Sequence, residues 1–298
     1  MRAAAELEHA ARELERAATE LAHAAPELER AAALIAGADA LLVCAGAGMG
    51  VDSGLPDFRG PEGFWRAYPP YRSLGLRFEE LADPVHFDAD PALAWGFYGH
   101  RLSLYRDTVP HAGYGVLLGW SRRVPARVFT SNVDGQFQRA GFAADEVAEV
   151  HGSIHHLQCV LPCRREVWPA GDLTVEVDPP TMRAVGPLPS CPHCGSLARP
   201  NILMFDDHCW VPDRSQRTLD SLAAWRRARR AERLVVIEIG AGTAVPTVRR
   251  QAELASAATG ALVRINPREP AVRHGRGISL PLGAAAALTA LDALLPAP

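Results

Sequence analysis

Four cysteines in two close pairs are the residues of this chain whose type and spacing point most directly to a chemical role. Cys159 and Cys163 form the first pair, and Cys191 and Cys194 form the second. Two such turns can bring four thiolates to one tetrahedral Zn²⁺, and a site filled by four sulfurs leaves no position for a water molecule. We therefore predict one structural zinc ion per chain, with His193 as a weaker alternative ligand.

A glycine-rich segment follows a short apolar run near residue 40. The run ALLVC leads into Gly46, Ala47 and Gly48, a spacing that approximates the start of a dinucleotide-binding turn. Backbone N–H groups of such a turn can approach phosphate closely. Gly54 and Pro56 argue against the long helix that a plain nicotinamide dehydrogenase has next, and they favour an extended loop instead.

That loop carries three side chains suited to a nucleotide. Asp57, Phe58 and Arg59 follow one another directly. An arginine can pair with a pyrophosphate, and a phenylalanine can cover a flat ring. We therefore include all three in the candidate cofactor site.

Apolar runs alternate with helical stretches along most of the chain. The runs that predict buried strands are 40–48, 127–132, 233–240 and 261–266. The stretches that predict helices are 91–107, 113–121, 214–232, 247–258 and 283–295. This alternation predicts an α/β fold with a doubly wound parallel sheet, in which ligands bind at the carboxyl ends of the strands.

Three divisions of the chain follow from its composition. Residues 1–34 carry a heptad-like repeat with Leu at every seventh position, which predicts a helical extension that either packs on its own domain or mediates self-association. Residues 156–204 are rich in Cys, Pro and Gly and predict a small inserted zinc module. The remaining segments, 35–155 and 205–298, are expected to form the main domain. The stretch 61–85 is expected to be an irregular lid over the site.

Composition and charge exclude several classes of protein. The 298 residues are 48% hydrophobic and 22% charged, which is ordinary for a globular protein and argues against disorder, collagen or a coiled-coil rod. All 31 basic residues are arginine, and the net charge of −3 gives no electrostatic case for nucleic acid. No apolar run is long enough for a membrane helix, and the charged N-terminal segment does not resemble a signal peptide. With metal-type cysteine spacing, we expect a cytoplasmic protein.

Several motifs, taken in order, resemble the sirtuin family. GAGMGVDSGLPDFRG at 46–60 resembles its NAD-binding signature, TSNVDG at 130–135 its Asn-x-Asp segment, and HGS at 151–153 its His-Gly pair. The cysteine quartet follows, then RPNILMFDD at 199–207, which is similar to the strand that pairs with the acyl-lysine peptide. GAGTA at 240–244 and INPRE at 265–269 resemble two further NAD contacts.

The resemblance implies a Rossmann-like large domain and a small zinc module, with NAD and an acyl-lysine protein or peptide meeting between them. NAD would be consumed as a co-substrate: nicotinamide leaves, the acyl oxygen attacks the ribose, and the acyl group ends on ADP-ribose. The catalytic residues would be His151, Asn132 and Asp134. An imidazole can accept a ribose hydroxyl proton near neutral pH.

The remaining roles are also carried over from the resemblance. The cofactor would contact Gly46, Ala47, Gly48, Asp57, Phe58, Arg59, Ser131, Asn132, Asp134, Gly242, Thr243, Asn266 and Glu269. The substrate would contact Ile202, Leu203 and Phe205, together with Tyr98 and Arg101. Tyr98 and Arg101 lie three residues apart on a predicted helix, similar to the pair in sirtuins that remove succinyl, malonyl and glutaryl groups.

The chain departs from the family pattern at four places. Gly50 stands where the family has Ser, Ser131 where it has Gln, Gln136-Phe137 where it has Leu-His, and Asp206-Asp207 where it has Gly-Glu. The first hypothesis is an NAD-dependent protein-lysine deacylase. The alternatives are an NAD hydrolase or ADP-ribosyltransferase that uses the same site, and a non-catalytic nucleotide-sensing protein.

Overall fold

The computed structural model describes residues 12, 15–57, 64–65, 68–73 and 75–296. Over this part of the chain the main sheet has six parallel strands in the order β11-β10-β9-β1-β2-β3. They are β1 (Ala40–Ala45), β2 (Ala126–Thr130), β3 (Val147–Glu149), β9 (Leu234–Ile239), β10 (Leu262–Ile265) and β11 (Ile278–Leu280). The direction of winding reverses between β1 and β9, which pair with each other from Ala40 opposite Leu234 to Ala45 opposite Ile239.

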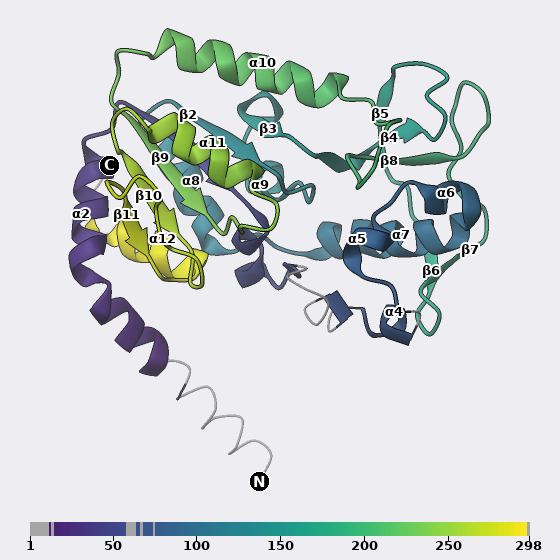
Figure 1. Ribbon diagram of the computed structural model, residues 1–298, viewed down its shortest axis with the longest axis horizontal. Helices are drawn as coiled ribbons and strands as arrows, with labels where there is room; N and C mark the ends of the chain where they lie inside the picture. The colour runs from purple at the N-terminus through teal and green to yellow at the C-terminus, as the bar shows by residue number, and fades with distance from the viewer. Residues whose placement is uncertain (1–11, 13–14, 58–63, 66–67, 74, 297–298) are drawn as a thin grey trace.

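Helices cover both faces of this sheet, which explains why its central strands are apolar on both sides (Figure 1). All six residues of β1 are buried. One face is covered by α2 (Ala25–Ala36), α8 (Ala112–Ser121) and α12 (Ala284–Leu294), and the other by α10 (Asp213–Ala228) and α11 (Thr247–Ser256). The predicted doubly wound parallel sheet is confirmed.

Among the described residues, the two shortest strands of this sheet are the ones that the sequence pattern did not predict. The strands β3 and β11 have three residues each, too few for a hydrophobic pattern to stand out. They lie at the two edges of the sheet and extend a structure that the longer strands define.

A second lobe lies beside the large sheet (Figure 1). It contains an antiparallel sheet of β5 (Val167–Pro169), β4 (Gly152–Cys159) and β8 (Ala198–Ile202), and a hairpin of β6 (Glu176–Asp178) and β7 (Arg183–Val185). Its helices are α4 (Pro69–Ser73), α5 (Phe78–Leu81), α6 (Val85–Ala89) and α7 (Pro91–Asp107). The stretch 61–85, expected to be irregular, thus contains short helices where the structure describes it.

One aromatic core joins the two parts of this lobe. It includes Phe64, Tyr71 and Trp95 from the helical part, and Leu157 and Met182 from the inserted part. The expected boundary at residue 155 falls inside β4, because that strand continues from Gly152 to Cys159 without interruption. We therefore propose that the helices α4, α5, α6 and α7 belong with the zinc module.

The described part of the heptad repeat packs on its own domain. The α2 helix has Pro26 in its first turn, as expected for a residue that lacks a backbone N–H, and it follows a helical stretch over 15–23. Its Leu28 and Ile35 are buried against the face that α12 also covers, and Leu21 packs against the same cluster. The Leu positions that would form a self-association seam are therefore used internally at residues 21 and 28.

Candidate active site

A cavity of about 640 Å³ opens at the point where the winding of the main sheet reverses. Its walls come from the loops after β1, β2, β3, β8, β9 and β10, and from α5 and α7 of the second lobe. Open parallel sheets bind ligands at this position because the two neighbouring loops diverge there. The predicted residues that line it are Gly46, Ala47, Asp57, Tyr98, Arg101, Ser131, Asn132, Asp134, His151, Ile202, Leu203, Phe205, Gly242, Thr243 and Glu269. Phe58 and Arg59 lie outside the described residues.

The glycines after β1 allow the backbone there to pack closely against the backbone after β9. The N–H groups of Gly46 and Gly48 are already hydrogen-bonded to carbonyls. A Cβ atom at Gly48 would lie 2.7 Å from the Gly240 Cα atom, and one at Gly46 would lie 2.7 Å from the Ala241 Cα atom. The Gly46 N–H donates to the Ile239 carbonyl at 2.9 Å, and the Gly48 N–H donates to the Gly240 carbonyl at 3.0 Å. The expectation that both amides face phosphate is therefore corrected, because strand-to-loop bonds already use them.

Asn132 is held in place by both its backbone and its side chain. Its Nδ2 donates to the Gly46 carbonyl at 3.0 Å, and its backbone N–H donates to Thr130 Oγ1 at 3.0 Å. Thr130 Oγ1 in turn donates to the Ala45 carbonyl at 2.9 Å. The amide group of Asn132 is thus fixed at the floor of the cavity, between the loops after β1 and β2.

Asp134 is a buried carboxyl group whose protonation is shifted toward the neutral form. Burial raises the pKa of Asp134 to about 6, although the hydrogen bond that Oδ1 accepts from the Gln136 N–H at 2.9 Å acts in the opposite direction. The negative charge of Glu149 raises this pKa further. Near neutral pH the group can therefore accept hydrogen bonds as a carboxylate and can also take up a proton at modest cost.

His151 follows β3 directly and lines the same cavity. Its carbonyl accepts a hydrogen bond from the Leu203 N–H at 2.9 Å, which ties it to the segment after β8. Burial lowers the pKa of His151 below its usual value. The imidazole is therefore neutral at pH 7, the form that can accept a proton.

Both residues at the Asp206-Asp207 departure have a defined place in the local structure. Asp206 has φ of 52°, a conformation that glycine adopts at the lowest cost and that Asp tolerates better than most residues. Asp207 accepts two hydrogen bonds from the buried Arg199, at 2.7 and 2.8 Å. The Met204 N–H also donates to Asp207 Oδ2 at 3.4 Å, so the ion pair is tied to the segment that carries Leu203 and Phe205.

Two loops near the C-terminus, the one after β9 that carries Thr243 and the one after β10 that carries Glu269, are hydrogen-bonded to each other. Thr243 donates to Glu269 through its backbone N–H at 3.2 Å and its hydroxyl at 2.5 Å. The buried Arg249 donates to the carbonyls of Ala241 and Glu269 at 3.0 and 3.1 Å. It therefore clamps the loop after β9 against the loop after β10.

Asn266, which the resemblance places among the cofactor contacts, has a side chain that bonds to the protein backbone in this structure. It is fully buried, its Nδ2 donates to the Ala241 carbonyl at 2.9 Å, and its Oδ1 accepts from the Arg268 and Glu269 amides at 3.0 Å. The side chain therefore shapes the loop. Asn266 and Gly48 line a smaller neighbouring pocket of about 70 Å³. Asp57 and Arg268 line both this pocket and the large cavity.

Two polar residues at this site were not predicted from the sequence. Tyr105 accepts hydrogen bonds from Arg101, and its position four residues later on the predicted helix is a spacing that could have revealed it. His155 is half-buried, and its Nε2 lies 2.9 Å from the Asp134 carbonyl oxygen. Its ring also packs where a Cβ atom at Gly135 would lie. No pattern in the sequence indicated that contact.

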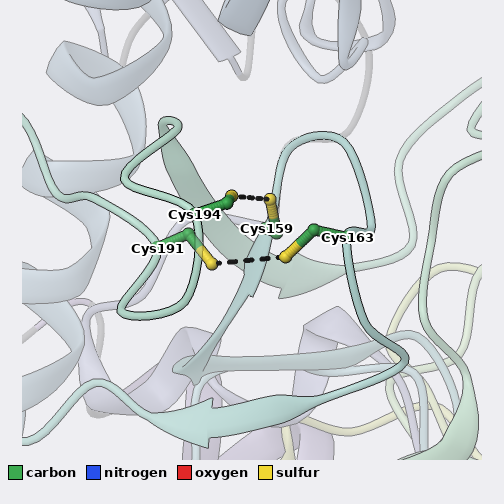
Figure 2. A group of neighbouring side chains, drawn as sticks. All are labelled: Cys159, Cys163, Cys191 and Cys194. Atoms are coloured by element: carbon green, nitrogen blue, oxygen red, sulfur yellow. Dashed lines mark hydrogen bonds between the residues drawn. The ribbon is translucent and has the colours of Figure 1, made fainter.

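The four cysteines predicted to bind metal converge at the end of the second lobe (Figure 2). Their Sγ atoms all lie within 4.8 Å of one another, with Cys159 and Cys194 at 3.7 Å and Cys163 and Cys191 at 3.7 Å. A tetrahedron with Zn–S bonds of about 2.3 Å has edges of about 3.8 Å. The residues therefore fit a structural Zn²⁺. His193 points to a different partner, since its Nε2 lies 2.7 Å from Glu166 Oε2.

Comparisons with known proteins agree with this geometry. A family model described as the Sir2 family matches residues 46–245. The NAD-dependent protein deacylase of Mycolicibacterium paratuberculosis is 30% identical over 263 residues, which cover 86% of this chain and 98% of that protein. The NAD-dependent protein deacylase 1 of Archaeoglobus fulgidus is 32% identical and covers 77% of this chain and 82% of its own length. A solved Sir2 homologue–NAD complex has a TM-score of 0.68 at 27% identity, covering 89% of this chain and 92% of that one.

Removal of the zinc should unfold the second lobe, because the Zn–S bonds would no longer hold the two cysteine pairs together. We expect one Zn²⁺ per chain by elemental analysis and a lower melting temperature in the presence of a strong chelator. Cys191→Ser should lose both zinc and stability, whereas Cys209→Ser, outside the quartet, should keep both. Full zinc content in Cys191→Ser would contradict the assignment.

The pKa of Asp134 predicts a pH-dependent stability. Because its folded-state pKa of about 6 exceeds the ordinary 3.8, the folded state retains this proton between pH 4 and 6 while the unfolded state releases it. The stability from this group is complete below pH 4 and is lost as the pH rises to 6. In Asp134→Asn, the free energy of unfolding relative to wild type should therefore rise by on the order of 2 kcal/mol between pH 4 and 7.

Urea unfolding at several pH values would measure this difference. The exposed Asp145→Asn is the matched control and should show a difference from wild type that does not change with pH. A pH-independent difference for Asp134→Asn would contradict the raised pKa.

Proposed function

Because the chain belongs to the Sir2 family, we propose that it is an NAD-dependent protein-lysine deacylase that transfers the acyl group to ADP-ribose and releases nicotinamide. NAD is consumed as a co-substrate, and zinc has a structural role. The observation that carries this proposal is the single cavity at the reversal of the sheet. It joins the Gly46 loop, the Asn132–Asp134 segment, His151 and the substrate strand at Ile202–Phe205.

Each of the three catalytic candidates has a local environment suited to its proposed role. His151, neutral at pH 7, would accept a proton from a ribose hydroxyl. Asn132, fixed by its bond to the Gly46 carbonyl, would offer amide polarity beside the reacting carbon. Asp134 would accept hydrogen bonds from the nicotinamide amide. Ala47 would donate its backbone N–H to phosphate, since its two glycine neighbours use theirs internally.

A second candidate activity rests on Ser131. This residue lines the cavity next to Asn132, and its short side chain replaces the glutamine that is usual in the family. The extra space could admit water to the ribose carbon, which would give NAD hydrolysis or ADP-ribosyl transfer at the same site. The hydrogen bonds between Arg199 and Asp207 support the segment that would pair with a peptide, which favours the deacylase over this alternative.

We propose acyl groups with a terminal carboxylate as the preferred substrates. Tyr98 and Arg101 of α7 both line the cavity and are both buried. The guanidinium carbon of Arg101 lies 5.6 Å from the centre of the Tyr98 ring. A buried guanidinium beside a phenol is a receptor for a carboxylate, because arginine can bind both oxygens.

Self-association and location remain predictions. Self-association would depend on the first part of residues 1–34, since Leu21 and Leu28 pack internally. Over the described residues, no helix has the length and apolar character needed to cross a lipid bilayer. We propose a cytoplasmic location, because a cluster of four metal-binding thiols is maintained in a reducing compartment.

The reaction can be tested by mass spectrometry of the products formed from NAD and an acyl-lysine peptide. We expect O-acyl-ADP-ribose with wild type, and a loss of about 10²–10⁴-fold in rate with His151→Ala because the general base is removed. The exposed His23→Ala should retain wild-type turnover. Free ADP-ribose formed without peptide would instead indicate NAD hydrolysis, and near-normal turnover in His151→Ala would refute the base assignment.

The acyl preference can be tested with peptides of one sequence that carry either succinyl- or acetyl-lysine. Wild type should have the higher kcat/KM for succinyl, and Arg101→Met should lower that ratio by about 10–150-fold through loss of a charged hydrogen bond. Arg227→Met, on the exposed side of α10, serves as the matched control. A wild-type preference for acetyl would show that the pair does not select the acyl group.

A further inference from the structure

Tyr105 and Arg101 form a bonded pair inside the cavity. Tyr105 lies one helical turn after Arg101 on α7, and its hydroxyl oxygen accepts from Arg101 Nη2 at 2.7 Å and from Nε at 3.1 Å. Arg101 is 5% exposed and Tyr105 is also 5% exposed, yet both line the cavity. The two bonds therefore lie at the wall of the acyl site, largely shielded from solvent, where hydrogen bonds are strong.

These bonds determine the direction of the guanidinium group. Nε and Nη2 share one edge of the planar fork, so bonding both to one oxygen fixes that edge toward Tyr105. Aromatic rings hold the plane itself, with the guanidinium carbon 5.1 Å from the Phe97 ring centre and 5.9 Å from that of Phe78. Nη1, which is not on that edge, is consequently directed to a different side from the Tyr105 hydroxyl.

The pair differs in charge from two other buried arginine contacts among the described residues. Arg199 bonds Asp207 and Arg264 bonds Glu238, and in both cases a carboxylate neutralises the guanidinium. The Tyr105 hydroxyl orients Arg101 without cancelling its positive charge, because burial raises the pKa of this phenol and keeps it neutral. The hydrogen bonds to Tyr105 therefore orient the guanidinium group and do not neutralise it.

Tyr105 is itself fixed from a second direction. Its backbone carbonyl accepts a hydrogen bond from Gln136 Nε2 at 3.1 Å, and the Gln136 N–H donates to Asp134 at 2.9 Å. Gln136 stands at one of the positions where the chain departs from the family pattern. Its contacts tie the α7 turn that carries Tyr105 to the segment that carries Asp134.

We propose that Tyr105 is a positioning residue for substrate selection, which orients Arg101 so that it binds the terminal carboxylate of an acidic acyl group. This inference rests on the proposed deacylase function and on the proposed acyl class. It adds that the preference depends on the Tyr105 hydroxyl as well as on Arg101.

Tyr105→Phe tests this directly, because it removes the hydroxyl and keeps the ring that packs beside Arg101. We expect kcat/KM for the succinyl-lysine peptide to fall about tenfold, mainly through KM, because binding of the acyl carboxylate is already present in the bound substrate. The acetyl-lysine peptide should change by no more than about twofold. The matched control is Tyr114→Phe, which removes a buried hydroxyl that has no hydrogen-bond partner and lies outside the cavity lining.

Fluorescence anisotropy with a labelled succinyl-lysine peptide, measured without NAD, gives a second readout that does not depend on turnover. Its Kd should rise about tenfold in Tyr105→Phe. An unchanged succinyl-to-acetyl ratio together with an unchanged Kd would overturn the inference. An equal loss for both peptides would also overturn it, since that result assigns Tyr105 a purely structural role.

The wild-type and Arg101→Met measurements separate this inference from its premises. If wild type prefers succinyl and Arg101→Met abolishes the preference, a negative result with Tyr105→Phe refutes only the positioning role. If wild type forms O-acyl-ADP-ribose but prefers acetyl, the acyl class fails and the inference fails with it. If ADP-ribose forms without any peptide dependence, the deacylase function itself is refuted.

Discussion

The contact between two glycine-containing loops at the reversal of the sheet is the constraint on which the site depends. The backbone after β1 and the backbone after β9 approach so closely that a Cβ atom at Gly240 would lie 2.4 Å from the Gly48 carbonyl carbon. Gly240 also has φ of 62°, where a side chain would add strain. Because these loops touch, the strands on either side carry their polar ends around one cavity instead of two separate surfaces.

Buried ion pairs then fix the segments that form the rest of the cavity wall. Arg199 of β8 bonds Asp207, which follows the Ile202–Phe205 segment of the cavity wall, and both side chains are almost completely buried. Arg264 and Glu238 bond within the sheet behind the C-terminal loops. Loss of one partner from such a pair leaves an isolated buried charge, which typically costs about 3–5 kcal/mol. The shape of the cavity is therefore maintained by interactions that tolerate little change on either side.

Much of the fold could be predicted from the sequence because its signals are local. The run at 40–45 is apolar throughout, as a central parallel strand requires, and the cysteine spacing specifies the metal cluster without knowledge of the fold. The hydrogen-bond partner of each backbone N–H group in the site could not be predicted in this way. Whether the Gly48 N–H faces a ligand or the Gly240 carbonyl depends on residues almost two hundred positions apart. The ion pair of Asp207 and the contact of His155 with Asp134 also depend on the tertiary structure. The pair of Arg101 and Tyr105, by contrast, has a local spacing of four residues.

The arginines of the buried ion pairs have a chemical consequence for the enzyme itself. A lysine at position 199 or 264 would carry the same ε-amine as the substrate, and its acylation would remove the positive charge from the pair. A guanidinium group stays protonated at any physiological pH. Since none of the 298 residues is lysine, the chain offers no ε-amine to reactive thioesters or anhydrides. An enzyme that would remove acyl groups from lysines of other proteins thus has buried ion pairs that lysine acylation cannot neutralise.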